Sequence, residues 1–190
     1  MSNQKTIGID IDGVMYPYYE QFRGYMRGYN IIFPKEPTTY SVYDGIMTRK
    51  EYIEYHAQFI GDAHYAIQNV NIKGDIYAGV VSTINKLKKL GYKIVIITSR
   101  GTIYHKDEFE LKSIEIKYTT EWLYEYKIQH DDLIFTTDKS DYKFDIFIDD
   151  SPKILETNKS KKVICKNQSY NQEYIGLRIN KFSEILKYVN

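Results

Sequence analysis

The sequence contains a single cysteine, Cys165, and it lacks both a long apolar run and an excess of charge of either sign. One cysteine cannot form an internal disulfide, which fits a chain kept in a reducing cytoplasm. No stretch approaches the ~20 apolar residues of a membrane span, and the first residues reach the first predicted strand without an apolar signal core. We therefore expect a soluble, cytoplasmic protein with no membrane partner.

The charges nearly balance, with 26 basic and 25 acidic residues and a formal net charge of +1. A nucleic-acid binder usually carries a basic stripe, so nucleic acid is not an expected partner. A small anionic ligand stays open. The 190 residues suit one ordinary domain, or a domain with a sizeable insertion, and the twenty tyrosines follow no period that would indicate a repeat.

A short apolar segment near the start of the chain ends in two aspartates. Residues 7–14 read IGIDIDGV, a pattern typical of a buried parallel strand that ends where Asp10 and Asp12 enter a loop. Side chains two residues apart in a strand point the same way, and neighbouring carboxylates raise each other's pKa unless a positive group is near. A divalent cation would supply that charge. The alternative is that both aspartates only form a turn at Gly13.

From residue 75 onward, apolar strand patterns alternate with helical patterns. Asp75 is the expected N-cap of the first of these helices. This alternation predicts an α/β fold, with a Rossmann-like parallel sheet and helices on both faces, formed by residues 1–15 and 75–190. The strands are expected at residues 93–98, 132–135, 144–148 and 163–165, and the helices at 76–90, 106–112, 120–126 and 182–189.

Residues 16–74 do not follow the alternation. A helical, aromatic-rich stretch occupies residues 16–30, and Thr48 with Glu51 has the Thr-x-x-Glu form of a capping box that opens a second helix. We expect that helix to reach about residue 60 and to end at Gly61. The segment is interpreted as a small helical cap over the carboxyl ends of the strands, where open α/β sheets bind ligands.

Polar residues also follow two later strands. Thr98 and Ser99 end the second strand, and Asp149 and Asp150 the fourth, with Lys139 in the loop before it. These positions should meet at one edge of a parallel sheet. Structural alternatives are open for each of them: Thr98 could only terminate its strand, the aspartate pair could only cap the helix that follows, and Lys143 could take the place of Lys139.

This ordered set resembles the haloacid dehalogenase-like superfamily, which has Asp-x-Asp at the first strand, Thr or Ser at the second, then a Lys, then an acidic pair. The resemblance spans residues 5–165. It implies a Mg²⁺ ion held by the Asp10 carboxylate, the main-chain carbonyl of Asp12 and a carboxylate of the acidic pair. We favour Asp149 as the direct ligand, with Asp150 acting through water or steadying Lys139. The reverse stays open.

The resemblance also implies a reaction. Asp10 would attack phosphorus to form an aspartyl-phosphate, while Asp12 would protonate the leaving alcohol and then activate water. Haloalkanoate-cleaving members as a rule lack the second carboxylate, so Asp12 favours phosphate ester hydrolysis. Thr98, Ser99 and Lys139 would bind the phosphate.

The run from Asp138 to Pro152 resembles that of the 5'(3')-deoxyribonucleotidases. This resemblance implies a substrate among the (deoxy)ribonucleoside 5'- or 3'-monophosphates. Tyr18, together with Tyr40 or Tyr43, is a candidate for stacking on the base, or else these rings only form the core of the cap. Arg100 departs from the family's usual Thr-Ser-Pro and is a candidate for a further phosphate contact.

Two other functions are kept open. One is a phosphatase of a non-nucleotide phosphate ester, and the other is a non-catalytic phosphate-binding module. A homodimer is also left open. The four histidines, which lie in no metal-ligand spacing, are interpreted as surface or packing residues: His56, His64, His105 and His130.

Overall fold

The structure is a computed structural model that describes residues 4–70, 76–103 and 109–189. Its centre is a six-stranded sheet in the order β3-β2-β1-β4-β5-β6, in which every pair of neighbouring strands is parallel. The predicted parallel sheet is therefore confirmed. The strands are β1 (Thr6–Ile9), β2 (Lys93–Thr98), β3 (Asp132–Phe135), β4 (Ile146–Asp149), β5 (Lys162–Lys166) and β6 (Leu177–Ile179).

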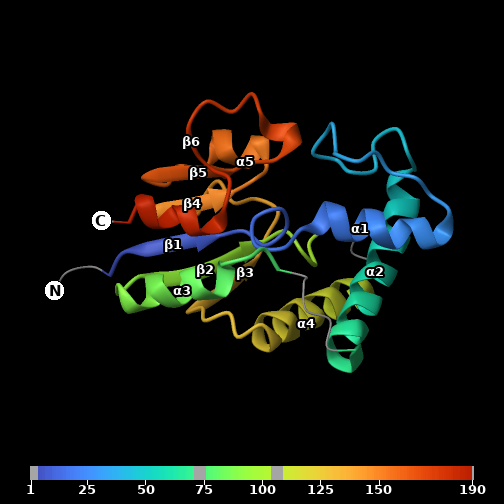
Figure 1. The fold of residues 1–190 in the computed structure, drawn as a ribbon, viewed down its shortest axis with the longest axis horizontal. Helices are drawn as coiled ribbons and strands as arrows, with labels where there is room; N and C mark the ends of the chain where they lie inside the picture. Colours follow the sequence, from blue (N-terminus) through green and yellow to red (C-terminus); the bar gives the residue numbers. More distant parts are fainter. Residues whose placement is uncertain (1–3, 71–75, 104–108, 190) are drawn as a thin grey trace.

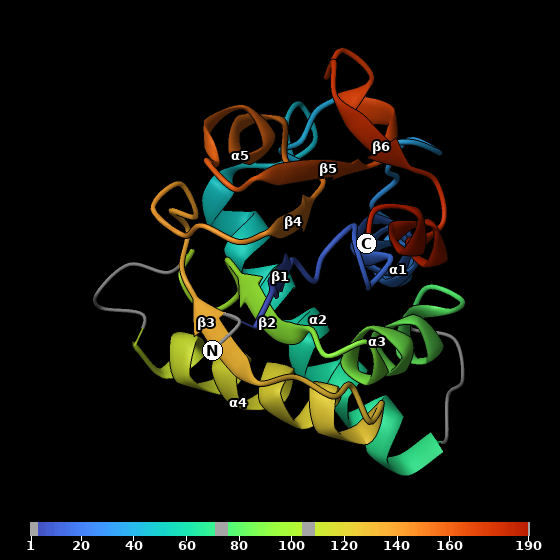
Figure 2. The same cartoon turned by 90° about the vertical axis from the view of Figure 1, so that its left-hand side faces the viewer.

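The central strands are built from β-branched residues that are buried on both faces. Ile9 of β1 lies beside Ile96 of β2 on one side and Ile148 of β4 on the other, and all three side chains are fully buried. Such continuous apolar runs are stable only when both faces of the sheet are covered. In Figure 2, which looks along the sheet, α5 covers one face while α3 and η3 cover the other.

Three of the α-helices alternate with the strands, and two further α-helices lie between β1 and the first of these three. The α-helices are α1 (Tyr18–Met26), α2 (Arg49–Val70), α3 (Val80–Lys89), α4 (Phe109–Glu125) and α5 (Pro152–Thr157), and the 3₁₀-helices are η1 (Arg27–Tyr29), η2 (Ser169–Asn171) and η3 (Phe182–Lys187). Among the described residues, no helix has the length and apolar character needed to cross a bilayer.

Helices α1 and α2 lie beyond the end of the sheet at which the strands point (Figure 1). The capping box forms as expected, since the Thr48 amide donates to Glu51 Oε2 at 2.8 Å and the Glu51 amide donates to the Thr48 hydroxyl at 3.3 Å. The helix does not end at Gly61, however, and that expectation was wrong. α2 continues to Val70 because it packs along α4, where a Cβ on Gly61 would meet the Tyr118 ring at 3.8 Å.

Helix α3 begins at Val80 rather than at residue 76, and the expected cap at Asp75 lies outside the described residues. The delay follows from a backbone contact: the Tyr77 amide donates to the Met15 carbonyl at 2.8 Å, which holds the chain against the loop after β1.

Helix α4 replaces two shorter helices that were expected at 106–112 and 120–126. Thr120 lies inside α4, where its hydroxyl donates to the Ile116 carbonyl at 2.8 Å, and so no helix begins there. The closing helix is a 3₁₀-helix that ends at Lys187. Strand β6, with Arg178 at its centre, was not predicted.

Candidate active site

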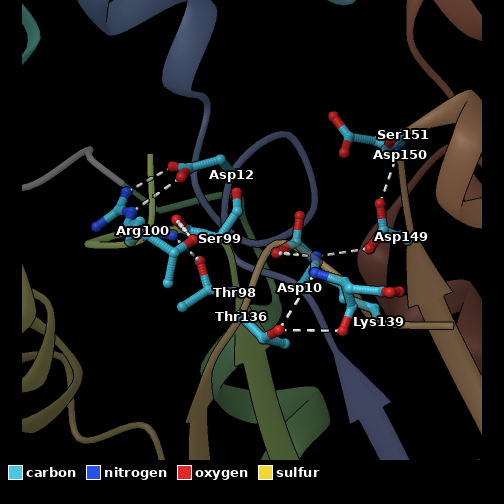
Figure 3. Close-up of polar contacts among 12 residues, drawn as sticks. Asp10, Asp12, Thr98, Ser99, Arg100, Thr136, Lys139, Asp149, Asp150 and Ser151 are labelled. Atoms are coloured by element: carbon cyan, nitrogen blue, oxygen red, sulfur yellow. Dashed lines mark hydrogen bonds and ion pairs between the residues drawn. The ribbon is translucent and has the colours of Figure 1, made fainter. Parts of the chain in front are cut away.

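Three predicted site residues lie at the carboxyl ends of adjacent strands. Asp10 directly follows β1, Thr98 ends β2 and Asp149 ends β4. The strand register aligns these ends, and the Asp10 amide donates to the Ile148 carbonyl at 3.0 Å. Figure 3 shows the three side chains around one point, with Lys139 reaching them from the loop after β3. The structure therefore brings together residues that are far apart in the sequence.

Lys139 joins the two strand-end carboxylates. Its Nζ lies 2.8 Å from Asp10 Oδ1 and 2.7 Å from Asp149 Oδ2, and none of these side chains is more than 6 % exposed. Burial alone would lower the pKa of the Lys139 ammonium, but the two carboxylates raise it well above its ordinary value. Lys143, the alternative in the sequence, is exposed.

Asp10, Asp149 and Asp150 form a buried acidic cluster. One carboxylate oxygen of each lies within 4.8 Å of the others. Burial raises the pKa of Asp10 to about 7, with Lys139 opposing the rise and Asp149 adding to it. Burial, followed by repulsion from Asp149 and Asp10, also raises the pKa of Asp150 well above its ordinary value. The cluster is therefore costly to ionise without additional positive charge.

A divalent cation fits this cluster. Three carboxylates and one ammonium leave an excess of two negative charges when all are ionised, and hard cations such as Mg²⁺ prefer oxygen ligands. Asp150 Oδ1 is buried and accepts no hydrogen bond within the described part of the chain. Both oxygens of Asp149, in contrast, are engaged, one by Lys139 and the other by the Ser151 amide at 2.8 Å. The orphaned oxygen favours Asp150 over Asp149 as the direct ligand.

The Asp12 carboxylate turns away from Lys139 and toward Arg100 (Figure 3). Arg100 Nε donates to Asp12 Oδ2 at 2.9 Å and Nη2 donates to Oδ1 at 2.6 Å, so the pair is bidentate. The guanidinium also lies over the rings of Tyr16 and Trp122, at 5.0 and 5.6 Å from their centroids. Asp12 is thus separate from the acidic cluster, and its side chain is 28 % exposed.

Thr98 and Ser99 take different positions at the end of β2. Thr98 is fully buried, and its hydroxyl accepts a hydrogen bond from the Arg100 amide at 3.2 Å. Ser99 lines the cavity beside the acidic cluster, and its carbonyl accepts from the Thr102 hydroxyl at 2.6 Å.

The loop after β1 and a C-terminal segment hold Asp150. Gly13 has a φ of +73°, and a Cβ there would lie 1.8 Å from Asp150 Oδ2, so only glycine fits. The Tyr170 hydroxyl donates to the same oxygen, and Asn171 Nδ2 donates to the Asp150 carbonyl at 2.9 Å. The sequence analysis assigned no role to these two η2 residues.

A cavity of about 620 Å³ opens beside the cluster. Its walls come from the segment between β1 and β2, from the loops after β2 and β3, from α4, from the segment after β4 with α5, and from η2. The polar groups next to the cluster include Asp12, Lys139 and Asp150, and the aromatic lining consists of Tyr18, Tyr19, Tyr40, Tyr43, Tyr52 and Tyr170.

The three tyrosines proposed to stack on a base are all at this cavity, in different settings. Tyr43 lies 4.6 Å from the Tyr52 ring in a stacked arrangement, and Tyr40 packs edge-on against Tyr170. Tyr18 is buried against Phe22, where the two rings stack at 5.6 Å. Tyr18 therefore contributes to the core as well as to the cavity wall.

A chain of polar groups connects this wall to α4. The Tyr18 hydroxyl lies 2.9 Å from that of Tyr52 and 2.7 Å from His56 Nδ1, and His56 Nε2 lies 2.7 Å from Glu115 Oε1. Burial raises the pKa of Glu115, but His56 and then Arg100 outweigh burial and hold it below its usual range. His56 is buried, which agrees with a packing residue, whereas His64 and His105 lie outside the described side chains.

Comparisons with known proteins match the chain to a family of nucleotidases. The family model described as "5' nucleotidase, deoxy (Pyrimidine), cytosolic type C protein" matches residues 4–189. A curated Chlorobaculum tepidum protein named "Putative 5'(3')-deoxyribonucleotidase" is 24% identical over 192 residues, covering 96% of this chain and 89% of that protein.

Solved structures share the fold at low sequence identity. The Bacteroides fragilis structure described as a "Putative haloacid dehalogenase-like hydrolase" is 14% identical with a TM-score of 0.56, covering 96% of this chain and 100% of its own. The Haemophilus somnus 129pt structure described as a "predicted phosphoglycolate phosphatase" is 14% identical with a TM-score of 0.54 and covers 100% of both chains.

Proposed function

Since the chain belongs to the family of cytosolic type C 5' nucleotidases, and is thus a phosphatase of phosphoric monoesters, we propose that it dephosphorylates (deoxy)ribonucleoside 5'- or 3'-monophosphates. The observation that carries the proposal is the position of Asp10, which is buried in the acidic cluster and paired with Lys139. Lys139 and Asp150 of this site in turn line a tyrosine-rich cavity. We also propose that the protein works in the cytoplasm.

The acidic cluster would hold Mg²⁺ through the carboxylates of Asp10 and Asp150, or Asp149 in its place, and through the main-chain carbonyl of Asp12. When bound, the ion supplies positive charge that screens the substrate phosphate from the carboxylates. Lys139, fixed by two ion pairs, contributes further positive charge at the same point.

The reaction would proceed in two steps on this chain's own residues. Asp12 enters the first step protonated. A carboxylate oxygen of Asp10 attacks phosphorus, the bond to the leaving oxygen breaks, and Asp12 gives that oxygen its proton. Asp12 then takes a proton from water as the water oxygen attacks the aspartyl-phosphate. The bond between phosphorus and Asp10 breaks and inorganic phosphate leaves. Thr98 and Ser99 would bind the phosphoryl group.

The cavity supports a nucleoside as the leaving group. At about 620 Å³ it falls in the range of ~300–1,000 Å³ that is usual for small-molecule sites. The tyrosines that line the cavity suit a planar base, since offset or edge-on aromatic contacts add to the free energy of burial. The similar Chlorobaculum tepidum protein, named for deoxyribonucleotides, points to the same class of substrate.

A turnover screen with Mg²⁺ tests the proposal. Phosphate release is measured for deoxyribonucleoside and ribonucleoside 5'- and 3'-monophosphates alongside sugar phosphates and phosphoglycolate. We expect the highest kcat/KM with nucleoside monophosphates, and no turnover with Asp10→Asn, which keeps the size of the side chain but removes the nucleophile. Equal or better turnover of the other esters would contradict the nucleotide assignment, and an active Asp10→Asn variant would contradict the mechanism.

A further inference from the structure

We propose that Arg100 is a positioning residue that holds the Asp12 carboxylate in place for proton transfer to the leaving oxygen. This inference rests on the proposed function, because it concerns the first step of that reaction. It differs from the sequence interpretation, in which Arg100 contacts the phosphate.

The Arg100 guanidinium is fixed before any substrate arrives. Its side chain is only 5 % exposed, and the planar group lies over both the Tyr16 and Trp122 rings. Burial alone would lower the pKa of Arg100, but Asp12 raises it, so the group stays charged. The two rings thus enclose the guanidinium from nearly perpendicular directions and add cation–π attraction.

Two N–H groups of this fixed guanidinium are directed at Asp12. The contacts of 2.9 and 2.6 Å, one to each carboxylate oxygen, define both the position and the plane of the carboxylate. A phosphate that bound these same donors would have to displace Asp12. The geometry therefore assigns the donors to the acid–base residue.

Asp12 depends on this contact for its orientation. It lies in the loop after β1 with its side chain 28 % exposed, whereas Asp10 is held by Lys139 inside the protein. Among the side chains that the structure describes, those of residues 4–62, 76–103 and 109–189, only Arg100 donates hydrogen bonds to the Asp12 carboxylate. An exposed carboxylate without Arg100 would sample other rotamers, and a small misplacement of a catalytic group costs orders of magnitude in rate.

Proton transfer from Asp12 accelerates the first step only when the leaving oxygen is strongly basic. When the bond to phosphorus breaks, its electron pair goes to the leaving oxygen. A nucleoside alkoxide is a strong base and needs the proton from Asp12, whereas 4-nitrophenolate is stable without it. Because kcat/KM covers the steps up to loss of the leaving group, it isolates this proton transfer from later hydrolysis of the aspartyl-phosphate.

The test compares Arg100→Met with the wild type on a nucleoside monophosphate and on 4-nitrophenyl phosphate, both with Mg²⁺. Methionine keeps an unbranched apolar side chain beside the two rings but carries no charge and no N–H donor. We expect kcat/KM to fall about 100-fold for the nucleotide, the size of a general-acid contribution, and by less than about 3-fold for the nitrophenyl ester. In the Asp12→Asn background, Arg100→Met should add less than about 3-fold for either ester.

Lys88→Met is the matched control, because it also removes a basic residue from an ion pair with an aspartate, at 2.5 Å to Asp131 and away from the cavity. It should leave both kcat/KM values unchanged. Arg100→Lys, which keeps the charge but loses the fork, should fall between Arg100→Met and wild type for the nucleotide.

Several outcomes would overturn the inference. Equal losses for both esters in Arg100→Met would indicate a phosphate contact or a general structural role. If Arg100→Met lowered kcat/KM by the same factor in the Asp12→Asn background as in the wild type, Arg100 would act independently of Asp12. If wild-type protein hydrolysed neither ester, the proposed function itself would fail. Nucleotide turnover with no effect of Arg100→Met would leave the function standing and reject only this inference.

Discussion

Lys139 determines, at the scale of single residues, whether the acidic cluster is tolerated. Its ammonium is shared between Asp10 and Asp149 at 2.8 and 2.7 Å, and its side chain is 4 % exposed. A buried ion pair adds little net stability, because removing both charges from water is costly. Removing only one partner is strongly destabilising, since it leaves an uncompensated buried charge.

Lys139→Met should therefore destabilise the metal-free protein by about 3–5 kcal/mol at pH 7, as measured by urea unfolding. Lys143→Met is the matched control, because Lys143 is an exposed lysine on the same loop, and it should change the unfolding free energy by less than about 0.5 kcal/mol. Similar losses in the two variants would mean that the paired ammonium is not what stabilises the cluster.

Single residues also show how far the sequence could predict the site. Asp10, Thr98 and Asp149 were predictable because each ends or follows an apolar strand, and parallel strands bring such positions to one edge. His56 and Glu115 were not, because their contact joins positions 59 residues apart that share no spacing rule. The sequence also could not predict the bidentate pair of Asp12 and Arg100, which are 88 residues apart, although each residue was a candidate for the site.

Among the elements, the turn after β1 places the backbone closest to the acidic cluster. Gly13 has a φ of +73°, a region that costs other residues about 1–2 kcal/mol. The same glycine also leaves the space that Asp150 Oδ2 occupies. Two separate requirements, a left-handed backbone and an absent side chain, therefore meet at one position.

A pair of alanine substitutions separates these requirements. Gly45 has nearly the same φ, +74°, but a Cβ there would meet no atom within 4 Å. Gly45→Ala should cost about 1 kcal/mol of unfolding free energy from backbone strain alone. Gly13→Ala should cost more in the same urea titration, and it should abolish phosphate release because it displaces Asp150. Equal costs, with activity retained in Gly13→Ala, would contradict this account of the turn.

The sequence was reliable for elements with a strong period and weak where tertiary contacts decide. The four apolar strands that follow β1 were all predicted close to their observed positions. β6 has only three residues with Arg178 in the middle, too short for a pattern. The guanidinium of Arg178 donates to the side-chain oxygens of Asn167 and Asn171, contacts that no strand pattern predicts. Helix α2 passes through Gly61 because packing against α4 outweighs the low helix propensity of glycine, about 1 kcal/mol relative to alanine.

At the scale of the whole molecule, the acidic cluster links folding to pH. The folded protein keeps a proton on Asp10 up to about pH 7, whereas the unfolded chain releases it near the ordinary aspartate pKa of 3.8. Between these values the folded state binds more protons than the unfolded state. The contribution of Asp10 to the stability of the metal-free protein therefore falls as pH rises from about 4 to about 7.

Mg²⁺ should reverse this trend, because it binds the deprotonated carboxylates and competes with their protons. At about 100 times its Kd the ion should stabilise the protein by about 2.7 kcal/mol, or roughly 5–10 °C in Tm for a chain of this size. We expect that full shift in a thermal melt at pH 8 and a much smaller one at pH 5.

Sodium chloride at matched ionic strength is the control for general salt effects and should not reproduce the shift. Asp150→Asn should reduce it at pH 8, since the variant removes the carboxylate with the orphaned oxygen. An equal Tm shift at both pH values, or an unchanged one in Asp150→Asn, would indicate that the ion binds elsewhere.

The hydrogen bonds from η2 to Asp150 have a consequence for protein synthesis. Asp10 leaves the ribosome about 160 residues before Tyr170 and Asn171, which contact Asp150 through its carboxylate and its carbonyl. Until these two residues emerge, the nascent polypeptide carries the nucleophile without its complete surroundings. Chains terminated between residues 150 and 170 would therefore be poor catalysts even though they contain every aspartate of the cluster.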